Sequence, residues 1–139
     1  MDGAAENGFL GMVEWLHANG SEGCTKQAMD GAATNGHLSV VKWLHTNRTE
    51  GFSIDNNKYI MDRVAENGHL LILEWFHANN WGEFAATTTG ASLDKAAAKG
   101  NLPVIEWLHK NCAVACAATT TGAMDKAAAN GHLPVVEWL

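Results

Sequence analysis

The chain has 139 residues, 47% of them apolar and 17% charged, which is typical of a single folded domain rather than a disordered tail. No apolar stretch approaches the ~18 residues that a membrane-spanning helix needs, and the formal net charge of -6 opposes binding to a phosphate backbone. We therefore expect no membrane and no nucleic-acid partner, and the odd cysteine count without a signal-peptide pattern predicts an intracellular, cytoplasmic setting.

A sequence of the type Met-Asp-Gly-Ala-Ala, followed ten residues later by Trp-Leu, recurs through the whole chain. Its five copies begin at Met1, Met29, Met61, Leu93 and Met124. Such a period indicates repeat architecture. We predict one repeat domain over 1-139 whose units start near 1, 25, 57, 90 and 121. Because its first and last units are incomplete, we expect it to be a fragment of a longer array.

Each copy has the pattern of two short helices. In the second copy Met29, Ala32 and Ala33 share one helical face, and the apolar stretch from Leu38 to Leu44 follows. The intervening Asn35-Gly36 predicts a left-handed helix cap. Proline at 103 and 134 falls where the second helix would begin, which supports this boundary.

A single unit is too small to fold alone. Four or five buried side chains stabilise it by about 6 to 15 kcal/mol, whereas ordering ~30 residues costs about 30 kcal/mol or more of backbone entropy. The units must therefore stack, so that neighbours share their apolar faces.

The stretch Met29 to Val41, with Ala32-Ala33, Gly36-His37-Leu38 and Val40-Val41, resembles the central part of the ankyrin repeat. The resemblance implies an all-α, ankyrin-like solenoid of about five helix-turn-helix repeats joined by loops or β-turn fingers. The usual Thr-Pro-Leu-His opening is replaced here by Gln27-Ala28-Met29-Asp30, and Trp-Leu-His stands late in the second helix, so the array is divergent.

The resemblance also implies a function, because ankyrin arrays bind proteins through a concave surface of first-helix residues and finger tips. Carried over, it predicts a protein-protein interaction scaffold with a partner of unknown identity. The first-helix row opens with glycines and an acidic residue and closes with lysines, which is either a graded binding surface or a plain solvated face. We expect the partner-binding residues to be Glu6, Thr34, Glu50, Phe52, Asp55, Arg63, Glu66, Trp81, Phe84, Lys95 and Lys126.

Two side-chain types recur with the repeat. The tryptophans at 15, 43, 75, 107 and 138 could line an aromatic groove, but we favour a role in the core between units, whereas Trp81 lies in a connector. The histidines at 17, 45, 77 and 109 fall in the last helical turn, where they favour the negative end of the helix dipole. By resemblance, the histidines after the turn glycine, at 37, 69 and 132, bond backbone across the inter-helix turn.

The sequence gives little support for a catalytic, metal or redox site. His109, Cys112 and Cys116 offer three metal ligands without a fourth nearby, so a small metal or redox protein is a weaker alternative. No catalytic or phosphate-binding motif is present. We predict no catalysis, no cofactor, no metal and no small-molecule substrate. A substrate-recognition segment of a larger adaptor or enzyme remains the other alternative.

Overall fold

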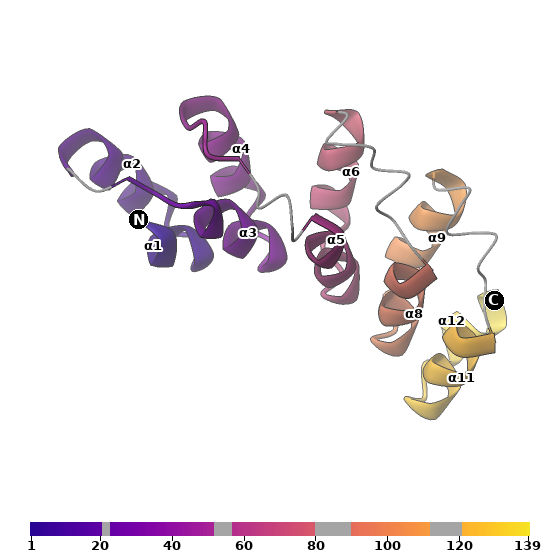
Figure 1. Ribbon diagram of the computed structural model, residues 1–139. Helices are drawn as coiled ribbons and strands as arrows, with labels where there is room; N and C mark the ends of the chain where they lie inside the picture. The colour runs from indigo at the N-terminus through magenta and orange to yellow at the C-terminus, as the bar shows by residue number, and fades with distance from the viewer. Residues whose placement is uncertain (21–22, 52–56, 80–89, 112–120) are drawn as a thin grey trace. The chain divides into compact units, whose positions relative to one another are not determined.

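The computed structural model describes residues 1–20, 23–51, 57–79, 90–111 and 121–139. This part of the chain is helical and contains five pairs of short helices (Figure 1). The first helices of the pairs are α1 (Asp2–Glu6), α3 (Lys26–Thr34), α5 (Asn57–Glu66), α8 (Gly90–Ala98) and α11 (Thr121–Ala129). The second helices are α2 (Leu10–Asn19), α4 (Leu38–Asn47), α6 (Leu70–Ala78), α9 (Leu102–Asn111) and α12 (Leu133–Trp138).

The turn inside each pair is a glycine helix cap, as the sequence predicts. At the end of α8, Gly100 has φ +75 and its N–H bonds Ala97 O at 3.1 Å, while the Asn101 N–H bonds Ala96 O at 3.0 Å. These two bonds define a Schellman motif, which satisfies carbonyls that the helix end leaves open. Positive φ angles recur at the equivalent glycines, at 8, 36, 68 and 131.

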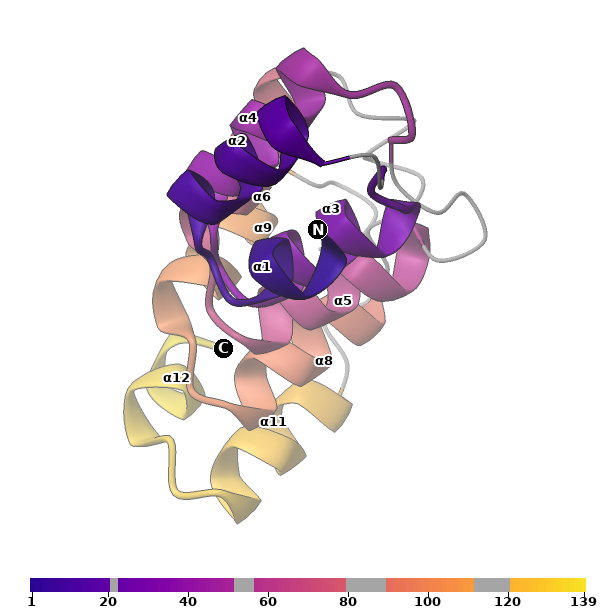
Figure 2. The same ribbon diagram turned by 90° about the vertical axis from the view of Figure 1, so that its left-hand side faces the viewer.

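Contacts divide the chain into two compact units, Met1–Ile60 and Met61–Leu139. In the first unit α1 lies against α3 and α2 lies against α4, so that like helices are neighbours (Figure 2). The fully buried side chains of this unit are small or aliphatic. They include Ala5, Val13, Ala32, Val40, Val41 and Leu44.

The second unit repeats this packing. There α8 lies against α11 and α6 lies against α9. Alanines of the first helices approach closely, and branched or aromatic residues of the second helices fill the space between pairs. The buried residues of this unit include Val64, Ala65, Ile72, Leu73, Phe76, Leu93, Ala96, Ala97, Val104, Ile105 and Leu108.

The predicted fold class, an all-α ankyrin-like helical repeat array, is confirmed by these pairs of short helices with their glycine turns. The predicted starts of the five repeats, near 1, 25, 57, 90 and 121, and the single domain over 1-139 stay predictions. None of the described helices is both long and apolar enough to cross a membrane.

One expectation about the core is wrong. The tryptophans do not form it, since Trp15 is 59% exposed and Trp43, Trp75, Trp107 and Trp138 are only half-buried. Aliphatic residues on neighbouring positions are buried in their place, while Trp43, Trp107 and Trp138 pack against solvent-exposed histidines.

Candidate protein-binding surface

The predicted binding residues of the first unit lie at helix ends and in the segment after α4. Glu6 is exposed at the end of α1, and its carbonyl accepts a hydrogen bond from Asn35 Nδ2 at 3.1 Å. Thr34, at the end of α3, is buried, and its hydroxyl bonds the carbonyls of Asp30 at 2.9 Å and Gly31 at 3.2 Å. The Thr34 hydroxyl is thus bonded to its own helix, while Glu6 offers a solvent-facing carboxylate.

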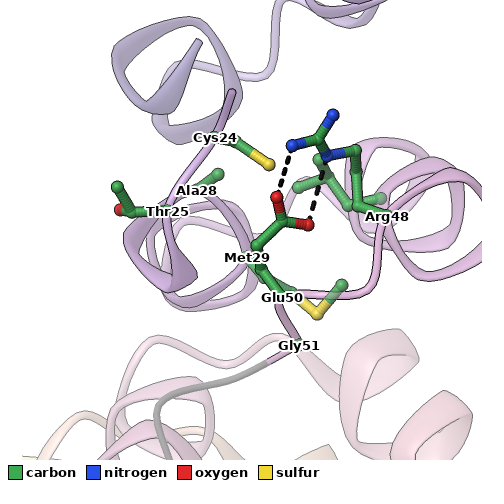
Figure 3. Close-up of a pocket in the computed structure, with 8 residues that line it drawn as sticks. Cys24, Thr25, Ala28, Met29, Arg48, Glu50 and Gly51 are labelled. Atoms are coloured by element: carbon green, nitrogen blue, oxygen red, sulfur yellow. Dashed lines mark hydrogen bonds and ion pairs between the residues drawn. The ribbon is translucent and has the colours of Figure 1, made fainter. Parts of the chain in front are cut away.

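Glu50 belongs to a small polar cluster beside α4. It forms a two-fold ion pair with Arg48, in which Arg48 Nε donates to Glu50 Oε2 at 3.1 Å and Nη2 donates to Oε1 (Figure 3). This hydrogen bonding lowers the pKa of the Glu50 carboxyl. The Arg48 guanidinium also approaches His17 Nδ1 at 3.5 Å.

Cys24 points its sulfur toward the same ion pair, and Met29 lies beside it (Figure 3). Burial raises the pKa of the Cys24 thiol, and the nearby Arg48 offsets part of this effect. A buried thiol with a raised pKa is a poor nucleophile. The cluster therefore anchors the segment after α4 rather than providing a reactive centre.

In the second unit the predicted residues occupy the first helices. Arg63 is exposed on α5, and Glu66 is half-buried at the end of that helix. Lys95 on α8 and Lys126 on α11 stand at the same repeat position as Arg63. This position, the third of each repeat, is therefore basic on all three first helices of the unit.

Both lysines pair with an aspartate of the preceding repeat. Lys95 Nζ lies 3.4 Å from Asp62 Oδ2, and Lys126 Nζ lies 2.9 Å from Asp94 Oδ2. The Lys126 side chain nevertheless stays 50% exposed and that of Lys95 37% exposed. An ion pair to a neighbouring repeat fixes the position of each amine without removing it from solvent.

The aspartates at the second repeat position were not predicted as functional residues. Asp62 is only 3% exposed, and it accepts a hydrogen bond from the Ser92 hydroxyl as well as from Lys95. In the first unit Asp2 accepts bonds from the backbone N–H of Thr25 at 2.8 Å and from its hydroxyl at 2.6 Å. The signal was present in the sequence, since every repeat carries Asp at this position.

Histidines supply a second link between repeats. His132 Nε2 lies 3.1 Å from Ala98 O, a carbonyl of the preceding repeat's first helix. Asn101 replaces histidine one repeat earlier, and its Nδ2 donates to Glu66 O at 2.7 Å. The bond thus joins two repeats, which the resemblance alone did not specify.

The histidines of the last helical turn have a further contact that the sequence pattern did not predict. The rings of His17 and Trp43 meet edge to face at 5.1 Å, those of His77 and Trp107 at 5.6 Å, and those of His109 and Trp138 at 5.2 Å. Edge-to-face geometry is the favoured arrangement for aromatic pairs. In these three pairs of repeats, the histidine thus packs on the tryptophan of the next repeat.

Four predicted binding residues, Phe52, Asp55, Trp81 and Phe84, lie outside the described residues, as do Cys112 and Cys116 of the alternative metal or redox site. Within the described ranges, no group of three or more His, Cys, Asp or Glu side chains could hold a metal ion.

Stacked helix pairs with glycine turns, linked within each compact unit by hydrogen bonds between neighbouring repeats, define a helical repeat protein. A sequence profile described as ankyrin repeats (many copies) matches residues 93–139. The predicted resemblance to ankyrin repeats is thereby confirmed for residues 93–139. The preceding helix pairs repeat the sequence pattern of this segment. A search of curated proteins gave no significant match.

Proposed function

We propose that the protein is a non-catalytic interaction scaffold, and that the first helices α5, α8 and α11 of the second unit provide its main binding surface for a protein partner. Ankyrin repeats generally mediate protein-protein interaction. Binding through these three helices is supported by a basic residue at the same repeat position of each, at 63, 95 and 126.

The contrast between buried and solvent-exposed positions of the first helices supports this surface. The small residues at the fourth and fifth repeat positions of α5 and α8, from Val64-Ala65 to Ala96-Ala97, are buried, and their variation is limited by packing. The third position is open to solvent at Arg63 and half-open at Lys95, so its side chain is free to differ. Varied, exposed residues on a rigid scaffold are the typical binding elements of repeat proteins.

The charge of this surface is mixed rather than uniformly basic. Asp62 and Asp94 lie between the basic side chains and are paired with two of them, whereas Arg63 and Asp125 are exposed. Such a surface fits a partner segment with both acidic and basic side chains, because each charge then meets its opposite. Glu6 and Glu50 of the first unit, and the predicted connector residues, stay proposed partner contacts in their own right.

The test is affinity capture from a host lysate, followed by titration of the purified partner. Arg63→Glu combined with Lys126→Glu should weaken binding at least about tenfold, which corresponds to ~1.4 kcal/mol. The matched control combines Lys42→Glu with Lys110→Glu, since these lysines are exposed on the second helices α4 and α9 and the change in charge is the same. Equal losses for both pairs would contradict binding through the first helices.

A further inference from the structure

The second helices of the second unit share a face that points away from the core. In this unit α6, α9 and α12 follow one side of the helix pairs, and α8 and α11 follow the other (Figure 2). Each second helix carries an apolar residue and, three positions later, a glutamate followed directly by a tryptophan, so the three side chains lie on one helical face. We call this surface the outer face. Its apolar residues and glutamates are Leu71, Pro103 and Pro134, and Glu74, Glu106 and Glu137.

The outer face is open to solvent because of the direction of its side chains. Leu71 is 65% exposed, and the two prolines and three glutamates are also exposed. The same two repeat positions are exposed in all five repeats, including Gly11 and Glu14 on α2 and Ser39 and Lys42 on α4. Stacking a further repeat on either side therefore leaves these positions uncovered.

The tryptophans make the outer face continuous from helix to helix. The Trp107 ring meets the ring of His77 on α6 edge to face at 5.6 Å, and the Trp138 ring meets that of His109 on α9 at 5.2 Å. Both indoles are half-buried, so one part of each ring is held by the junction and another part reaches solvent. An aromatic side chain that is already held in place loses little conformational freedom when a partner covers it, which suits it to be an interface anchor.

The charge of the outer face is acidic. Apart from histidine, the charged residues of α6, α9 and α12 are the three glutamates and Lys110. Among the described residues, none of the three carboxylates forms an ion pair with a lysine or arginine. The outer face thus combines exposed apolar groups with carboxylates that have no opposite charge, and a basic partner would supply that charge.

We propose that the outer face binds a basic amphipathic helix of another protein, laid across α6, α9 and α12. Neighbouring helices pack about 8 to 10 Å apart, and two turns of a helix, or seven residues, advance about 10.5 Å. A lysine or arginine at every seventh residue of the partner therefore meets one glutamate on each second helix. Apolar side chains on the same face of the partner then cover Leu71, the two prolines and the tryptophan rings.

The first unit does not offer the same surface. At the position of Leu71 it has Gly11 and Ser39, which present little apolar area, and Lys42 replaces the glutamate on α4. A basic helix would lose its apolar contacts there and meet a like charge. The inference is also separate from the proposed surface on the first helices, so the two tests can fail independently.

The test uses a synthetic three-heptad peptide with lysine at every seventh position and leucines on the same helical face, labelled with a fluorophore. Fluorescence anisotropy with the 139-residue chain should give a Kd of roughly 1 to 100 µM at low salt. Affinity should fall at high salt, because ions screen exposed charges. A peptide of the same composition in scrambled order should bind at least about tenfold more weakly. Equal binding of the scrambled peptide, or no binding of the ordered one, would overturn the proposal.

A charge reversal on α9 places the peptide on the outer face. Glu106→Lys should weaken binding of the ordered peptide at least about tenfold, because a lysine of the peptide then meets a like charge. The matched control is Glu14→Lys, which makes the same change at the same repeat position on α2 of the first unit, where the residue is also exposed. It should change the Kd less than about twofold. Equal losses for the two variants would contradict docking on α6, α9 and α12.

The apolar part of the face is tested separately. Leu71→Ser should weaken binding about threefold or more through the lost apolar contact, whereas Tyr59→Ser, at a residue 62% exposed on α5, should leave it unchanged. Similar losses for both would overturn the assignment of the apolar contact. Vesicles of anionic phospholipid provide the alternative ligand for an exposed apolar face. The glutamates should repel them, and vesicles that displace the peptide would overturn the proposal of a helical protein partner.

Discussion

The two units use the same aspartate position to join neighbouring repeats, but with different partners. In the first unit Asp2 bonds the neutral Thr25, at the start of α3, through both the backbone and the hydroxyl of that residue. In the second unit Asp62 bonds Ser92 and Lys95, and Asp94 pairs with Lys126. The aspartate is thus common to both junctions, whereas its partner differs with the residues at the start of the next helix.

The third repeat position accounts for much of this difference. It is glycine in the first unit, at 3 and 31, and basic in the second, at 63, 95 and 126. A Cβ atom at Gly31 would lie 3.1 Å from Glu6 Cβ, so the two first helices approach closely there. The first unit gains close packing at this position, and the second gains charged side chains that reach solvent.

The largest expected loss of stability follows substitution of the turn glycines. These substitutions test whether the junctions between repeats are packed alike in the two units. A Cβ at Gly100 would lie 2.6 Å from His132 Nδ1, and a Cβ at Gly8 would overlap the His37 ring. Two costs add. The left-handed backbone strains a residue that has a Cβ by about 1 to 2 kcal/mol, and displacing the histidine ring costs about 1 to 3 kcal/mol. Gly8→Ala and Gly100→Ala should each lower the free energy of unfolding by about 2 to 5 kcal/mol, measured by urea denaturation.

Gly131 is the matched control for this pair. It has the same φ of +75, but no atom lies within 4 Å of its Cβ position. Gly131→Ala should therefore cost only the strain, about 1 to 2 kcal/mol. If it destabilises as much as Gly100→Ala, the histidine does not fill the space beside the turn.

An intermediate loss of stability is expected when the hydroxyls that donate hydrogen bonds to Asp62 and Asp2 are removed. Ser92→Ala deprives the buried Asp62 of a donor and should cost about 1 to 3 kcal/mol. Thr25→Ala removes a bond to Asp2 and the cap that accepts from Gln27 N–H at 3.1 Å, for about 0.5 to 2 kcal/mol. Thermal unfolding of both variants measures the difference, with Ser92→Thr as the control that keeps the hydroxyl. An unchanged midpoint for Ser92→Ala would show that Lys95 alone satisfies Asp62.

The smallest effect is expected at the exposed ion pair of the second unit. Lys126→Ala removes the contact with Asp94, which is worth at most about 1 kcal/mol at a half-exposed site. The loss should shrink at high salt, because ions screen such pairs. Unfolding at low and high salt, with Lys110→Ala on α9 as a control for lost charge, tests this. A large, salt-independent loss would instead indicate that the Lys126 stem packs in the junction.

Much of the fold could be predicted because it depends on local pattern. The apolar spacing around Met29 and Leu38 and the Asn35-Gly36 dipeptide predicted two short helices with a left-handed turn, and the structure confirms both. The pattern did not reveal which large side chains are buried. Trp43 looks as apolar as Leu44, yet only Leu44 is in the core, because the direction of a side chain relative to the next repeat depends on how the repeats pack.

The proposed binding surface was less predictable for a related reason. The basic residues at 63, 95 and 126 were visible in the sequence, but their pairing with Asp62 and Asp94 joins residues about thirty positions apart. The burial of Thr34, which was expected to contact a partner, likewise depends on packing that a local pattern does not contain.

The sequence by itself determined the repeat, its helices and its turns, since these follow from short-range spacing, glycine conformation and the inability of thirty residues to bury a core alone. Only the tertiary structure decided which repeated residues link neighbouring repeats within each compact unit and which remain exposed. The same position is buried at Leu93 and open at Met124. The reason is physical: burial depends on whether a neighbouring repeat covers the position, and a side chain's own identity does not specify its neighbour.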